Sequence, residues 1–151
     1  MWLLLSFLES NQKLDNEMLL IQEYLPGDEY TIDSLFDMDG NFVLCVPRKR
    51  AYTYGGVSAI GETTHDNRFQ EIVKNIGKVI KFNGPVNIQV KEDVNGNLKL
   101  MEINPRLSGG LPITYKAGIN LPDLSYKLFK GIDINPQSYE DRKVFRYLNE
   151  V

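Results

Sequence analysis

Hydrophobic and polar residues along the chain follow the two spacings that distinguish strands from helices. Alternation with a period of two is typical of strands with one exposed face, and short continuous apolar runs are typical of buried strands. By these criteria the sequence predicts strands at residues 18–25, 29–37 and 41–46, on both sides of Asn95–Gly96, and at 144–148. On the second strand, Tyr30, Ile32 and Phe36 form one apolar face.

A stripe with helical spacing follows in the middle of the chain. It comprises Phe69, Ile72, Val73, Ile76, Val79 and Ile80, which predicts one amphipathic helix. Two shorter helices are predicted, one before Gly118 and one from Leu121, with Asn120 as N-cap and Gly131 after its last turn. We therefore predict an α+β fold, an antiparallel sheet with helices packed on one face.

The stretch between the third strand and the long helix is rich in glycine and basic residues. Residues 51–63 predict a long loop, a feature that is often functional. The basic cluster Arg48–Lys49–Arg50 is most simply a solvated strand end, with binding of an anionic substrate or phosphate as the alternative. We interpret His65 as a solvated residue beside a helix and Cys45 as a small apolar residue in a strand.

Composition limits the protein class. The 151 residues are 42% hydrophobic and 25% charged, with a net charge of −3, which favours a soluble globular domain and disfavours nucleic-acid binding. A single cysteine excludes an internal disulfide. The apolar segment Met1–Leu8 is too short to span a bilayer, so we expect no membrane association and a cytoplasmic location.

The hairpin around Asn95–Gly96 is the most informative feature. If its loop has two residues, the pairs that face each other include Asn87 and Asn104, Gln89 and Glu102, Val90 and Met101, and Glu92 and Lys99. Oxygen-bearing side chains then share one face, as Mg²⁺ ligands do. Arg106 lies just past the second strand, where it can bind a phosphoryl oxygen. The alternative is an ordinary solvated face, and a slip by one residue would separate Gln89 from Glu102.

Three segments resemble motifs of the ATP-grasp enzymes, and the branch around the large subunit of carbamoyl-phosphate synthase is the most similar. Residues 101–110 (MEINPRLSGG) resemble the metal-binding motif, 87–90 (NIQV) the strand before it, and 22–30 (QEYLPGDEY) the nucleotide hinge. They occur in the family's order, and the similarity extends from about Leu19 onward. The resemblance implies ATP and Mg²⁺, or Mn²⁺, as cofactors.

The resemblance also implies roles for individual residues at the phosphate end. Gln89 and Glu102 would hold one divalent ion, and Glu102 and Asn104 a second. Arg106 would be catalytic, because a fixed cation there stabilises charge on the transferred γ-phosphoryl group.

The hinge-like segment would bind the nucleoside end. Glu23 and Leu25 would contact the adenine, mainly through backbone groups, and Glu29 would accept hydrogen bonds from the ribose hydroxyls. Without the family context, Glu23 and Leu25 are an ordinary strand end, and Glu29 is a solvated edge residue.

The resemblance implies that the chain is a C-terminal lobe. Residues 1–17 would be a helical or linker segment left from a missing lobe, and residues 18–151 the lobe itself. The parent enzyme would activate a carboxylate or bicarbonate as an acyl phosphate for attack by an amine. Because catalysis by positioning needs both walls of the cleft, we expect the isolated chain to be weakly active or inactive.

Two alternatives keep the nucleotide site. The chain is either a non-catalytic nucleotide-binding module that docks on a partner, or a lobe of an amino-acid ligase or carboxylase of the same superfamily. Docking would use the apolar residues 2–8, on a second copy or on a partner that supplies the missing lobe. In each case we expect nucleotide and small-molecule partners.

Overall fold

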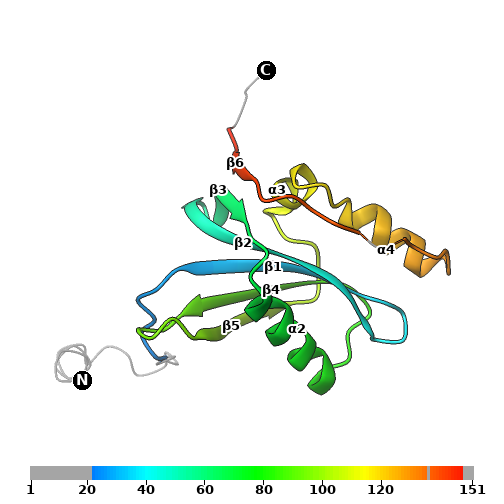
Figure 1. Ribbon diagram of the computed structural model, residues 1–151, viewed down its shortest axis with the longest axis horizontal. Helices are drawn as coiled ribbons and strands as arrows, with labels where there is room; N and C mark the ends of the chain where they lie inside the picture. Colours follow the sequence, from blue (N-terminus) through cyan, green and yellow to red (C-terminus); the bar gives the residue numbers. More distant parts are fainter. Residues whose placement is uncertain (1–21, 136, 148–151) are drawn as a thin grey trace, which may run out of the picture.

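The computed structural model describes residues 22–135 and 137–147. Its centre is one antiparallel sheet of six strands in the order β5-β4-β1-β2-β3-β6 (Figure 1). The strands are β1 (Glu29–Phe36), β2 (Phe42–Tyr54), β3 (Val57–Thr63), β4 (Gly84–Glu92), β5 (Leu98–Asn104) and β6 (Lys143–Phe145). The predicted α+β class and the antiparallel sheet are confirmed.

Helices cover both faces of this sheet (Figure 1), which refines the prediction of a single covered face. Helix α2 (Asn67–Val79) packs Phe69 and Val73 on the face of β1 that carries Ile32 and Phe36. The predicted apolar face of β1 is thus buried under the predicted amphipathic helix.

The other face of the sheet is covered by two shorter helices, α3 (Leu111–Lys116) and α4 (Leu121–Phe129). Leu121 and Leu124 of α4 pack against Leu35 of β1, whose side chain points away from α2. The side chain of Asn120 accepts a hydrogen bond from the backbone N–H of Asp123, which confirms the predicted N-cap.

Gly77 sits inside α2 because the ring of Phe36 leaves no room for a side chain. A methyl group on Gly77 would lie 2.6 Å from Cε1 of Phe36. Alanine in a helix interior normally stabilises by about 0.5–1 kcal/mol relative to glycine, but forced overpacking costs about 1–3 kcal/mol. We therefore expect Gly77→Ala to lower the free energy of unfolding by about 1–2 kcal/mol, measured by urea denaturation. In the exposed control Asn75→Ala, stability should stay the same or rise; a stabilised Gly77→Ala would contradict the packing.

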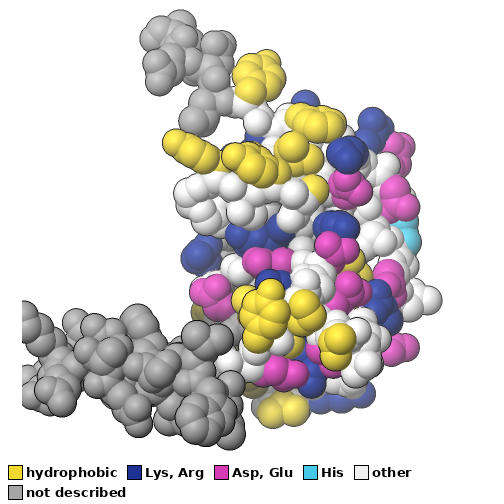
Figure 2. Space-filling view, turned by 90° about the vertical axis from the view of Figure 1, so that its left-hand side faces the viewer, with side chains coloured by type: hydrophobic (Ala, Val, Ile, Leu, Met, Phe, Trp, Pro, Cys, Tyr) yellow, Lys and Arg dark blue, Asp and Glu magenta, His cyan; other side chains and the backbone are white. Residues whose placement is uncertain are grey.

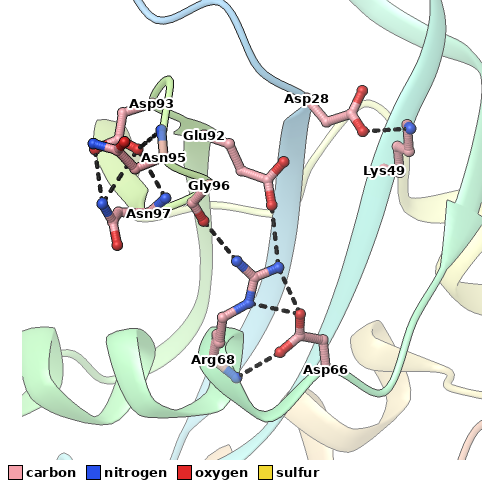
Figure 3. Close-up of polar contacts among 9 residues, drawn as sticks. All are labelled: Asp28, Lys49, Asp66, Arg68, Glu92, Asp93, Asn95, Gly96 and Asn97. Atoms are coloured by element: carbon pink, nitrogen blue, oxygen red, sulfur yellow. Dashed lines mark hydrogen bonds and ion pairs between the residues drawn. The ribbon is translucent and has the colours of Figure 1, made fainter.

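The hairpin turn from β4 to β5 encloses three residues, 94–96, between the paired residues Asp93 and Asn97, not the predicted two. The backbone N–H of Asp93 donates to the carbonyl of Asn97 (2.9 Å), and Gly96 adopts φ +79°. The Asp93 carboxylate accepts hydrogen bonds from Asn97 and Asn95 (Figure 3), which hold its pKa below the usual range. Residues 37–41 close the β1–β2 hairpin in the same way.

The longer loop shifts the strand register by one residue, and a β-bulge at Met101 shifts it back. Between loop and bulge, Val90 pairs with Leu100 and Glu92 with Leu98, so the predicted partners Met101 and Lys99 were wrong. Beyond the bulge the predicted pairs are restored: Gln89 with Glu102 and Asn87 with Asn104. The two deviations cancel at the polar end of the hairpin.

Helix α2 is tied to the tip of this hairpin by Arg68 (Figure 3). Its guanidinium lies 3.1 Å from Oε1 of Glu92 and donates to the carbonyl of Gly96 (2.7 Å). The same side chain pairs with Asp66, whose carboxylate caps the helix by accepting from the Arg68 N–H (2.9 Å). The hairpin that carries the candidate metal ligands is thus held against the α2 side of the fold.

The predicted loop at residues 51–63 is instead a β-hairpin. Strand β2 continues to Tyr54 and β3 begins at Val57, joined by Gly55 and Gly56, which have φ of +56° and +76°. Two successive glycines with positive φ fit a tight hairpin turn, so the small residues mark a turn and not an irregular segment.

The predicted strands at the two ends of the sequence differ from the structure. Residues 22–25 are not in a strand, and Tyr24 is 84% exposed; residues 18–21 lie outside the described residues. The predicted strand at 144–148 is β6, which pairs with β3 from Ile60 to Glu62. Residue 148 lies outside the described part.

Candidate functional site

The polar side chains of β4 and β5 gather on the sheet face that α3 and α4 cover in part. Gln89 lies opposite Glu102, and Asn87 opposite Asn104. Asn87 is buried and donates to Oδ1 of Asp33 (3.3 Å), so it is part of the sheet's interior. The predicted juxtaposition of Gln89, Glu102 and Asn104 on one face is confirmed.

The donor set of these three side chains fits a magnesium ion that also binds phosphates. In residues 22–135 and 137–147, no cluster of three His, Cys, Asp or Glu is placed to hold a metal, so such a site depends on one carboxylate and two amides. Mg²⁺ typically uses one or two carboxylates plus substrate phosphates and water. The buried Nδ2 of Asn104 has no hydrogen-bond partner in the described structure, which leaves this amide free to reorient its oxygen toward an ion.

Arg106 follows β5 in a tight bend, with its backbone N–H donating to the carbonyl of Asn104 (2.7 Å). Its exposed guanidinium donates to the carbonyl of Leu107 (3.0 Å) and pairs with no carboxylate of the described residues. The side chain lines the same cavity as Gln89. An unneutralised cation therefore stands beside the candidate metal ligands.

This cavity has a volume of about 170 Å³ and lies between the polar face of the sheet, the β2–β3 turn and the loop after β5. Its lining comprises Thr31, Arg48, Arg50, Gly56, Val57, Ser58, Asn87, Gln89, Arg106, Ser108, Gly109 and Gly110. Figure 2 views the molecule from one end, and there charged side chains occupy the middle of the surface between two hydrophobic patches.

Arg48 joins the sheet to the loop that carries Arg106. It is completely buried, with Nε 3.1 Å from Oδ2 of Asp33 and Nη2 donating to Oγ of Ser108 (2.9 Å). The hydroxyl of Thr114 in α3 donates to the same Asp33 oxygen (2.5 Å). The interpretation of the basic cluster as a solvated strand end is therefore wrong for Arg48.

Asp33, the partner of Arg48, was not predicted from the sequence. Strand alternation places Asp33 on the face opposite Ile32 and Phe36, the face for which no covering helix was predicted, so no local pattern marked this carboxylate as buried.

Comparison with known proteins gives the family of this site. The family model described as "ATP-grasp in the biosynthetic pathway with Ter operon" matches residues 15–150. The chain belongs to the ATP-grasp family. The resemblance seen in the three motifs is thereby confirmed.

Two relatives are large chains of carbamoyl phosphate synthase. The arginine-specific chain of Bacillus subtilis (strain 168) is 30% identical over 130 residues, which cover 78% of this chain and 12% of the relative. That of Saccharolobus solfataricus is 40% identical over 78 residues, 49% of this chain and 7% of the relative. This ATP-grasp chain therefore spans only a small part of either relative.

Two solved structures share the fold at low identity. The biotin carboxylase domain of a thermophilic 2-oxoglutarate carboxylase, bound to bicarbonate, superposes with a TM-score of 0.65 at 16% identity, over 85% of this chain and 31% of that one. N5-carboxyaminoimidazole synthetase from Staphylococcus aureus gives 0.59 at 15% identity, over 76% and 33%. These similarities establish the fold.

In the described ranges, no helix is long and apolar enough to cross a membrane.

In this ATP-grasp chain, Arg50 connects Glu29, the candidate ribose-binding residue, to Gln89, a candidate metal ligand. Its Nε lies 3.0 Å from Oε1 of Glu29, and its Nη1 lies 3.4 Å from Oε1 of Gln89 and from Oγ1 of Thr31. Its Nη2 donates to the carbonyl of Gly56 (2.9 Å). Through these hydrogen bonds, Arg50 holds the β2–β3 turn against the polar face of the sheet.

The rest of the hinge-like segment lies apart from the cavity. Glu23 is exposed, with Oε2 3.7 Å from Nζ of Lys99, and Leu25 is half-buried. The segment lies beside the end of β4, and there the N–H of Gly27 donates to the carbonyl of Glu92 (3.1 Å). The structure therefore groups Glu29 with Gln89 and places Glu23 and Leu25 near the tip of the β4–β5 hairpin.

Cys45 and His65 lie away from this site. Burial raises the pKa of the Cys45 thiol to about 12, which makes it a poor nucleophile at neutral pH. His65 is half-exposed just before α2 and stacks on Tyr139, with ring centroids 4.1 Å apart. Both features agree with the roles expected from the sequence.

Proposed function

We propose that this chain is the ATP- and Mg²⁺-binding lobe of an ATP-grasp ligase. The ligase would activate a carboxylate or bicarbonate as an acyl phosphate, which an amine then attacks. The observation that carries the proposal is the β4–β5 register, which sets Gln89 opposite Glu102 on one face, two residues from Asn104 and beside a cavity lined by Arg106.

At the phosphate end of the proposed site, Gln89, Glu102 and Asn104 would hold one or two Mg²⁺ ions through oxygen atoms. A bound ion neutralises charge on the phosphates and orients the γ-phosphoryl group. Arg106 would add positive charge where negative charge develops during transfer. Its lack of a carboxylate partner among the described residues supports this role, because a paired guanidinium is less available to an anion.

At the nucleoside end, Glu29 would accept hydrogen bonds from the ribose, and Glu23 and Leu25 would lie against the adenine. Glu29 is held near the metal ligands through Arg50, a suitable arrangement for a ligand whose ribose and phosphates are joined. We infer further that residues 18–151 form a lobe of a two-lobed cleft. Turnover by the chain alone should then be slow, because its residues supply one wall.

The proposal is tested by titrating the chain with a non-hydrolysable ATP analogue, in Mg²⁺ and in EDTA, by calorimetry. We expect Mg²⁺ to tighten binding at least about tenfold through the shared ion. Glu102→Ala should abolish that difference, because it removes the only carboxylate of the ligand set. The control Glu71→Ala changes a carboxylate on the exposed side of α2 and should bind like the wild type. Equal Mg²⁺ dependence in Glu102→Ala and Glu71→Ala would reject the metal site.

A further inference from the structure

Three lysines line a groove on the sheet face that α2 covers, opposite the face of the candidate metal ligands. The groove lies between α2 and the β1–β2 hairpin and has a volume of about 500 Å³. Its lysines are Lys74, Lys78 and Lys81, and none of the described residues that line it is acidic. The chain as a whole has a net charge of −3, so this positive groove is a local feature of an acidic protein.

The three lysines have no carboxylate partner among the residues that the structure describes. Nζ of Lys74 lies 5.1 Å from the ring centroid of Phe42, and Nζ of Lys78 donates to Oδ1 of Asn75 (3.1 Å). Lys74 and Lys78 are four residues apart on α2, a spacing at which like charges repel each other and weaken a helix. Their charges are therefore left for an anion from another molecule.

The edge of β2 that borders the groove has no partner among the described strands. Strand β3 pairs only with Arg48–Tyr54, whereas β2 extends past the end of β3 back to Phe42 (Figure 1). Residues 42–46 therefore have β1 on one side and an unpaired edge on the other. The groove continues along this edge into a second cavity of about 230 Å³, which shares Phe42, Val43 and Gln70 with it.

The two sides of this edge differ in chemical character. On the α2 side, Phe42 packs with the helix beneath the lysines. On the other side, Val43 and Leu44 belong to the apolar cluster around α4. Side chains of an extended chain point alternately to the two faces of a sheet. A strand added here would thus meet positive charge with every second side chain and an apolar surface with the others.

We propose that this groove binds an acidic segment of a partner protein, which adds to the free edge of β2 in an extended conformation. Its main chain would form hydrogen bonds with the unpaired backbone groups of β2. Its carboxylates would pair with Lys74 and Lys78, and its alternate apolar side chains would contact Val43 and Leu44. The surface lies opposite Gln89 and Glu102, so this inference is independent of the proposed nucleotide site.

The spacing of the lysines favours such a segment over one small anion. Lys74 and Lys78 are about 6 Å apart along the helix axis, and Lys81 lies beyond the end of α2 at Val79. Several carboxylates along one extended chain can each reach a different lysine. Contacts between opposite charges also accelerate association and weaken as salt is added, which gives the interaction a measurable signature.

The test is a titration of the 151-residue chain with a synthetic peptide in which glutamate and valine alternate, followed by amide NMR signals at low ionic strength. We expect saturable shifts of the signals of Val43 and Cys45 and a loss of affinity at high salt. The double variant Lys74→Gln, Lys78→Gln should raise Kd by about tenfold or more. The matched control Lys116→Gln, Lys130→Gln removes two exposed lysines from α3 and the end of α4; it should bind like the wild type.

The wild-type titration alone can overturn the proposal, since absence of saturable shifts at Val43 and Cys45 would reject the site. Equal weakening by the two double variants would show general charge attraction and would also reject it. Two further measurements address other occupants. Binding to phosphatidylserine vesicles without binding to the peptide would assign the lysines to a membrane surface. Shifts of the Val43 signal with protein concentration alone would assign the edge to a second copy of the chain. Either result would reject the acidic partner segment.

Discussion

Replacing Asp33 with alanine should lower the free energy of unfolding by about 3–5 kcal/mol, because it leaves the charge of Arg48 buried without a partner. Asp33 accepts hydrogen bonds from Arg48, Asn87 and Thr114, and both members of the ion pair are about 1% exposed. Arg48 has almost no solvent exposure in the folded protein, so hydration compensates little for the lost partner. The loss of stability is measured by urea denaturation. An m-value equal to that of the wild type would show that the variant still unfolds in a two-state transition.

Asp28→Ala is the matched control for this variant. Asp28 also pairs with a cation on β2, Nζ of Lys49 at 2.5 Å, but its side chain is 48% exposed. Exposed ion pairs contribute about 0–1 kcal/mol, so this change should cost little. The double variant Asp33→Ala, Arg48→Met should recover much of the stability that Asp33→Ala loses, since an apolar side chain of similar length replaces the unpaired guanidinium. Equal losses for Asp33→Ala and Asp28→Ala would contradict the buried pair.

The hairpin register shows how a sequence prediction can reach the right contact through incomplete reasoning. Alternation on both sides of Asn95–Gly96 is a local pattern, and it correctly predicted that Gln89 faces Glu102. The additional loop residue follows from the side chain of Asp93, which accepts from two later backbone groups. The bulge at Met101 that compensates for it has no comparable signal in neighbouring residues.

The buried ion pair could not be predicted from neighbouring residues. In the sequence, Arg48 belongs to a run of three basic residues, and such runs are usually solvated. Its burial arises because Ser108 and Gly110, some sixty residues later, pack over its guanidinium, as does α3 through Thr114. Glycine-rich turns pose the opposite difficulty: Gly55–Gly56 suggested a loop, although the residues on both sides pair as strands.

In a two-lobed ligase of the kind we propose, Arg106→Ala should lower kcat by about 10²–10³-fold, the range seen when one fixed charge-stabilising donor is removed. The reason is the proposed position of its guanidinium, which lines the cavity beside Gln89 without a carboxylate partner among the described residues. If Arg106 acts mainly on charge that develops in the transition state, the affinity for Mg²⁺–ATP should change far less than kcat. The measurement is the rate of ADP formation with the acid substrate present, together with nucleotide binding.

Two companion variants separate the charge of Arg106 from its geometry and from general surface effects. Arg106→Lys keeps a positive charge but loses the planar fork, so it should recover part of the lost rate. Arg142→Ala removes an exposed arginine that pairs with Glu140, and it should leave kcat unchanged. If Arg106→Ala keeps kcat within about tenfold of the wild type, Arg106 does not stabilise the phosphoryl group in the way we propose. An equal loss of nucleotide affinity and of kcat/KM would instead assign Arg106 to ground-state binding of the phosphates.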